Sequence, residues 1–121
     1  DRYAAAALWL ADEAEPGTMI FQTDWDDFTR LYFYNSDLVY TAGLDPTFMQ
    51  LHDEDLFDLW VDITRGDVDE PGVIIRDRFG ASYVFSDLKH GDFIAEAEED
   101  SLLEEVYRTD DAVIFAVRPS P

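Results

Sequence analysis

The sequence contains no cysteine, a single lysine and no long hydrophobic run. Without cysteine, the chain has no disulfide framework, no thiolate metal site and no cysteine nucleophile. No apolar run approaches the roughly 18 residues that a membrane span needs. The sequence therefore predicts that these 121 residues form a soluble unit.

Basic side chains are scarce, with 8 Lys and Arg against 28 Asp and Glu and a formal net charge of -20. Binding to nucleic acid or to an anionic membrane surface needs clustered Lys and Arg, so this composition excludes both partners. The carboxylates are spread from Asp1 to Asp111. That spread favours a general surface property, such as adaptation to a host with high salt, where screening weakens self-repulsion. A cation-binding protein and an ordinary acidic domain remain alternatives.

Apolar residues make up 47% of the chain and aromatic residues 15%, which is enough to build a core. Strand-like and helix-like segments alternate along it. We therefore predict a single α/β domain over residues 1–121: a three-layer fold with a mostly parallel sheet of about five strands and a C-terminal antiparallel hairpin. The expected strands are 19–21, 38–41, 81–85, 103–108 and 112–118. The expected helices are 3–14, 24–31, 53–65, 69–79 and 91–99.

Polar residues follow two of the predicted strands. The segment 24–27 (DWDD) comes after the first strand, and Asp87, Lys89, His90 and Asp92 come after the third. In an open α/β sheet, ligands bind beyond the carboxyl ends of parallel strands, so these groups are expected to converge. A groove there would bind hydroxyls through carboxylates and stack a sugar on Trp25. The predicted ligand-binding residues are Asp24, Trp25, Asp26, Asp27, Asp45, Asp87 and His90.

An enzyme is an alternative at the same edge. An apolar strand followed by Asp-x-Asp resembles the nucleophile motif of haloacid-dehalogenase-type phosphatases. By that resemblance, Asp24 would attack phosphorus, Asp26 would be the acid or base, and Ser86 and Lys89 would bind phosphate beside Mg²⁺. Phe28 departs from that motif, because the family has Thr or Val at this position.

Metal binding is a further alternative for the Asp cluster, because carboxylate oxygens suit Ca²⁺ or Mg²⁺. The sequence has no calcium-loop spacing, and neither His52 nor His90 has a histidine partner three or four residues away. The simplest alternative is that Asp24 caps a helix while Asp26 and Asp27 face water. We predict no metal and no cofactor.

Several short segments occur in an order that suggests a family. They are Trp9-Leu10, 16–21 (PGTMIF), 78–85 (RFGASYVF), 102–108 (LLEEVYR) and 112–118 (AVIFAVR). This order resembles the soluble C-terminal domain of multi-spanning membrane glycosyltransferases of the lipid-phosphate-sugar-dependent class, which are related to protein mannosyltransferases. The segments 24–28 (DWDDF) and 43–46 (GLDP) look like signatures of one subgroup.

The resemblance implies that the chain is the extracytoplasmic end of a longer integral membrane protein. A start without Met, inside a predicted helix, agrees with a fragment. In such enzymes the catalytic acid lies in the membrane portion, so no catalytic residue is expected here. The implied function is a non-catalytic accessory domain that contributes to acceptor or glycan binding. Its implied partners are the membrane portion of the same polypeptide and a glycan or lipid-linked sugar; an acidic protein-interaction module is the other non-enzymatic alternative.

Overall fold

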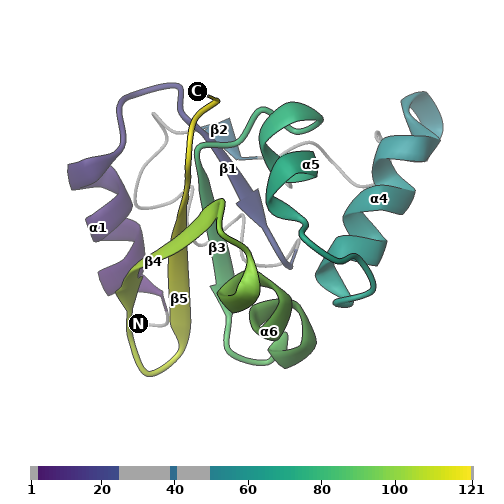
Figure 1. Cartoon of the computed structure of the whole chain (residues 1–121). Helices are drawn as coiled ribbons and strands as arrows, with labels where there is room; N and C mark the ends of the chain where they lie inside the picture. The colour runs from purple at the N-terminus through teal and green to yellow at the C-terminus, as the bar shows by residue number, and fades with distance from the viewer. Residues whose placement is uncertain (1–2, 25–38, 41–49, 121) are drawn as a thin grey trace.

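A mixed sheet with helices on both faces forms the described part of the chain (Figure 1). The computed structural model describes residues 3–24, 39–40 and 50–120. In these residues the strand order is β2-β1-β3-β5-β4. The strands are β1 (Met19–Gln22), β2 (Val39–Tyr40), β3 (Tyr83–Asp87), β4 (Leu103–Arg108) and β5 (Ala112–Val117). The helices are α1 (Ala4–Glu13), α4 (Glu54–Thr64), α5 (Gly72–Asp77) and α6 (Gly91–Glu99).

The prediction of a mostly parallel five-stranded sheet is wrong. Among the described strands of four or more residues, β1 and β3 form the one parallel pair, and β5 is antiparallel to both β3 and β4. The two-residue β2 adds a short parallel pairing to β1. The C-terminal hairpin is present, but it does not simply extend one edge of the sheet. Instead, the chain runs from β3 through α6 to β4, which is not adjacent to β3. The following strand, β5, lies between β3 and β4 and pairs with both.

The interior position of β5 has a physical cause in its side chains. Ala112 and Ile114 belong to the core on one face of the sheet, whereas Val113, Phe115 and Val117 belong to the core on the other. A strand that is apolar on both faces stabilises the fold most where helices cover both faces, because its side chains are then fully removed from water. An edge position would leave part of this surface in water.

Two separate cores lie on the two faces of the sheet (Figure 1). Helix α1 covers one face, where Leu10 packs with Ile20 and Phe85. Helices α4, α5 and α6 cover the other face, where Ile63, Ile75 and Phe93 are among the buried side chains. The alanines of α1 that face the sheet, Ala6 and Ala7, are fully buried, which allows a close approach of the helix.

Local contacts place α4 beside the start of α6. Asp53 caps α4, since its carboxylate accepts a hydrogen bond from the Leu56 backbone N–H at 3.1 Å. The chain leaves α4 through Gly66, whose φ of 79° favours glycine. A Cβ at Gly66 would lie 2.6 Å from the Asp92 backbone carbon. Glycine therefore allows the end of α4 to approach the first turn of α6.

Candidate functional site

The neighbouring strands β1 and β3 change from apolar to polar where they end. Gln22 and Thr23 at the end of β1, and Ser86 and Asp87 at the end of β3, are at most 4% exposed. Because β1 and β3 are parallel, these ends lie at the same edge of the sheet. Buried polar side chains are less favourable in a sheet than apolar ones, so this edge is a candidate for function.

Short hydrogen bonds join the two strand ends. The Thr23 backbone N–H donates to the Phe85 carbonyl at 3.2 Å, and its Oγ1 donates to Ser86 Oγ at 3.1 Å. Ser86 Oγ in turn donates to the Asp87 carbonyl at 2.7 Å. Both hydroxyls are thereby engaged within the fold, which holds the strand ends in a defined relative position.

Asp87 organises the turn between β3 and α6. Its Oδ1 accepts the backbone N–H groups of Lys89 and His90 at 2.8 and 3.2 Å and lies 2.9 Å from His90 Nδ1. Burial raises the pKa of the Asp87 carboxyl, but the side-chain hydrogen bond and charge of His90 and the two backbone N–H groups outweigh it. The net pKa lies below its ordinary value. Asp87 is therefore held ionised beside the imidazole.

Asp24 meets Asp87 and His90 at this edge. One carboxylate oxygen of each aspartate and one ring nitrogen of His90 all lie within 4.8 Å of one another. Asp87 is buried, whereas Asp24 and His90 are half-buried. Two carboxylates and an imidazole at this separation can accept hydrogen bonds from hydroxyl groups or coordinate a cation.

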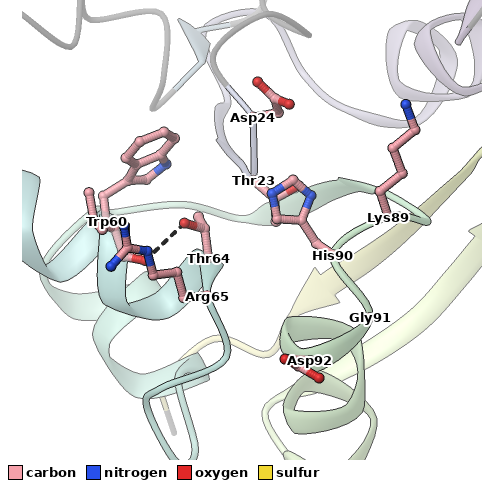
Figure 2. A pocket seen from close by; sticks show the side chains of 10 residues that line it. Thr23, Asp24, Trp60, Thr64, Arg65, Lys89, His90, Gly91 and Asp92 are labelled. Atoms are coloured by element: carbon pink, nitrogen blue, oxygen red, sulfur yellow. Dashed lines mark hydrogen bonds between the residues drawn. The ribbon is translucent and has the colours of Figure 1, made fainter.

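A pocket of about 720 Å³ opens beside these groups (Figure 2). Trp60 of α4 and Arg65, the residue that follows α4, lie on one side, Lys89 lies on the other, and His90 lies between them. Trp60 Nε1 donates to the Gln22 carbonyl at 2.8 Å, which fixes the indole beside the end of β1. The lining residues are Thr23, Asp24, Trp60, Val61, Thr64, Arg65, Lys89, His90, Gly91 and Asp92.

The pocket carries charges of both signs. Lys89, the one lysine of the chain, and Arg65 supply positive charge in a protein that has only 8 Lys and Arg. Asp24 and Asp92 supply negative charge in the same pocket. Donors and acceptors beside an aromatic ring suit an uncharged or zwitterionic polar ligand better than a polyanion.

The structure brings together three of the predicted site residues, Asp24, Asp87 and His90. Lys89 and Asp92, also expected at this edge, line the pocket. The predicted residues Trp25, Asp26, Asp27 and Asp45 lie outside the described residues, as does the helix expected over 24–31.

Sequence reasoning missed the wall of the pocket that α4 provides. Leu56, Trp60 and Ile63 have the spacing of one apolar face in the helix expected over 53–65, which predicts a buried Trp60. In the structure Trp60 is half-buried and its ring borders the pocket. A signal was available, because an indole N–H in an apolar stripe still needs an acceptor. The polar pair Thr64-Arg65, at the end of the helix, was a second signal.

Comparisons with known proteins add no relatives. No protein-family model matches the chain, and searches of curated proteins and of solved structures find no match. The resemblance to membrane glycosyltransferases therefore stays a prediction. Among residues 3–24, 39–40 and 50–120, no helix combines the length and the apolar character needed to cross a membrane.

Proposed function

We propose that this chain is a non-catalytic accessory domain that binds a polyhydroxylated, glycan-like ligand in the pocket at the ends of β1 and β3. The observation that carries the proposal is that Asp24 and His90, which meet the buried Asp87, line the pocket together with Trp60. Carboxylates and imidazole accept hydroxyl protons, and the face of an indole packs against the C–H face of a sugar ring.

The shape and the donors of the pocket support this ligand class. A volume of about 720 Å³ lies within the range of small-molecule sites. Lys89 and Arg65 add hydrogen-bond donors for ring and hydroxyl oxygens on opposite sides of the pocket. The indole is held by its bond to the Gln22 carbonyl, so little side-chain freedom is lost when a ligand packs against it.

The sequence resemblance supports a location and a partner for this activity. On that basis the domain belongs to a membrane glycosyltransferase-like protein, lies on the extracytoplasmic side, and contacts the membrane portion of the same polypeptide. It would then bind part of the acceptor or of a lipid-linked sugar while the reaction takes place elsewhere in the protein.

The phosphatase alternative finds less support in the geometry. It requires the Ser86 hydroxyl to bind phosphate, but Ser86 is 0% exposed. Its Oγ accepts from Thr23 and donates to the Asp87 carbonyl, so it is committed to the fold. A binding function uses Asp24 and His90, which line the pocket, without this hydroxyl.

Calorimetric titration with a panel of soluble oligosaccharides tests the proposal. We expect saturable binding that weakens at least tenfold in Trp60→Ala and in Asp24→Asn. Trp9→Phe is the matched control, because Trp9 stacks on Tyr107 on the α1 side of the sheet. Equal binding by the site variants and the wild type, or no binding to any member of the panel, would overturn the proposal.

A further inference from the structure

We propose that Asp24, Asp87 and His90 bind a divalent cation of the Mn²⁺ or Zn²⁺ class at the edge of the pocket. The three side chains come from two separate parts of the chain, the end of β1 and the turn between β3 and α6. The parallel pairing of β1 with β3 brings these parts together.

The spacing of the donor atoms suits a cation. The three donor atoms lie within 4.8 Å of one another, and Asp87 Oδ1 is 2.9 Å from His90 Nδ1. Two adjacent ligands of an ion with metal–ligand bonds of about 2.1 Å are roughly 3 Å apart. The ionised Asp87 carboxylate can only accept, so His90 Nδ1 carries the hydrogen of this contact. A cation therefore binds by displacing that proton, with Asp87 and His90 as adjacent ligands and Asp24 as a third.

The chemistry of the donors selects the type of ion. Two carboxylate oxygens and one imidazole nitrogen suit Mn²⁺ or Zn²⁺, whereas Ca²⁺ and Mg²⁺ prefer oxygen ligands alone. The Asp87 carboxylate is already oriented by the backbone N–H groups of Lys89 and His90. Such supporting hydrogen bonds hold a ligand in place before the metal binds.

Gln22 gives a second, independent indication of a ligand at this edge. Its side chain is 0% exposed, and neither its Oε1 nor its Nε2 has a hydrogen-bond partner among residues 3–24, 39–40 and 50–120. Gln22 ends β1 and Asp87 ends β3, and the residues two positions before them, Ile20 and Phe85, belong to the same core. Strand alternation therefore places the side chains of Gln22 and Asp87 on the same face of the sheet. A buried amide without partners is rare in proteins and often marks an ion or a water. On this face its Oε1 is suited to join the coordination of a cation on Asp87, directly or through a water.

A second acidic group in the molecule serves as a contrast. Asp69, Glu70, Glu96 and Glu99 line another pocket, of about 410 Å³, near α5 and α6. These side chains are carboxylates only, and none of them is buried. This pocket is lined by carboxylates without an imidazole. Substitutions in it therefore control for cation binding that arises only from the negative charge of the surface.

The cation would also act in ligand binding, and this part rests on the proposed function. A bound Mn²⁺ or Zn²⁺ retains open coordination positions that face the pocket, and two vicinal hydroxyls of a glycan can occupy them. Glycan binding is then expected to depend on the divalent cation.

Titration of the 121-residue chain with Mn²⁺, followed by electron paramagnetic resonance in 0.5 M KCl, tests the site. The salt screens the diffuse attraction of cations to a protein of charge -20. We expect one saturable Mn²⁺ per chain, with at least tenfold weaker binding in Asp24→Asn and in His90→Gln. These two variants leave the buried Asp87 in place. The control variant Glu96→Gln/Glu99→Gln is expected to bind as tightly as the wild type.

Proton NMR gives a readout that does not depend on affinity alone. The chain has two histidines, and Mn²⁺ is expected to broaden the imidazole signals of His90 at a concentration that leaves those of His52 sharp. Equal Mn²⁺ binding by the wild type and both site variants, or equal broadening of the two histidines, would overturn the cation site.

Glycan titration with and without EDTA separates the two proposals. One outcome is that glycan binding persists in EDTA and that the Mn²⁺ titration shows no saturable site. This result overturns the cation site and supports the glycan pocket. A saturable Mn²⁺ site in a protein that binds no glycan supports the cation site and overturns the proposed function.

Discussion

Two buried aspartates lie at opposite edges of the sheet, and their partners differ. Asp100, which precedes β4, accepts the backbone N–H of Gly72 at 2.6 Å and that of Leu102 at 2.9 Å, one on each carboxylate oxygen. Asp87, which ends β3, accepts two backbone N–H groups on one oxygen and also contacts the His90 ring. The two side chains are 5% and 4% exposed, so burial alone does not distinguish them.

The difference shows how a structural carboxylate can be told from a candidate functional one. Asp100 bonds to the backbone on both oxygens and links the start of α5 to the start of β4. Asp87 bonds to the backbone and to a titratable side chain, and it lies beside Asp24 and His90, which line a pocket. Perturbing Asp100 should therefore change stability alone, whereas perturbing the Asp87 edge should change ligand or cation binding as well.

The largest effect is expected for Asp100→Ala. The substitution leaves one buried and one partly buried N–H group without an acceptor, which lowers the free energy of unfolding by about 3 kcal/mol. Urea denaturation measures this change, with the exposed Asp110→Ala as a control that stays within about 0.5 kcal/mol of the wild type. Mn²⁺ affinity of the folded variant is expected to be unchanged. A loss of Mn²⁺ binding in folded Asp100→Ala would remove the contrast between the two edges.

Gln22→Leu is expected to act in the opposite direction. The amide of Gln22 is buried and has no partner in the part of the chain that the structure describes, and leucine has a similar volume without the polar atoms. The free energy of unfolding should therefore rise by about 1 kcal/mol, measured by urea denaturation in EDTA. A decrease in the free energy of unfolding would mean that the Gln22 amide stabilises the fold, as Asp100 does. The contrast between the two edges of the sheet would then be lost.

The smallest effect is expected for the pH dependence of Asp87→Asn. The pKa of Asp87 is lower in the folded protein than its ordinary value near 3.9. Its ionised form therefore contributes stability above about pH 4, and this contribution is lost as the pH falls through the folded-state pKa. The difference in urea midpoint between the wild type and Asp87→Asn should shrink between pH 6 and pH 2.5. A constant difference over this range would show that ionisation of Asp87 does not stabilise the fold.

Several elements were predictable because their signals are local. The helix expected over 91–99 is α6, and the hairpin expected from 103–108 and 112–118 is β4 with β5. In both cases apolar spacing and turn residues within one short segment are sufficient. The meeting of Asp24 with Asp87 and His90 was also predictable, because it requires only that β1 and β3 are parallel neighbours.

Other features depend on contacts that no local pattern contains. The position of β5 inside the sheet depends on how helices from other parts of the chain cover both faces of the sheet at that position. The role of Trp60 and Arg65 in the pocket follows from the approach of α4 to α6, which Gly66 permits. Trp60 belongs to an apolar stripe in the sequence, and only packing decides that its ring borders a pocket.

The sequence by itself determined the helices and strands of the described residues, the strong excess of acidic side chains and the identity of three converging side chains. Apolar periodicity, turn residues and composition act over a few positions, so they can be recognised along the chain. The tertiary structure decided the mixed arrangement of the sheet and the wall that α4 contributes to the pocket. It also decided that the polar residues at the ends of β1 and β3 are buried side by side. Thr23 and Ser86, which join the two strand ends, are 63 positions apart, and only the pairing of β1 with β3 brings their hydroxyls within 3.1 Å.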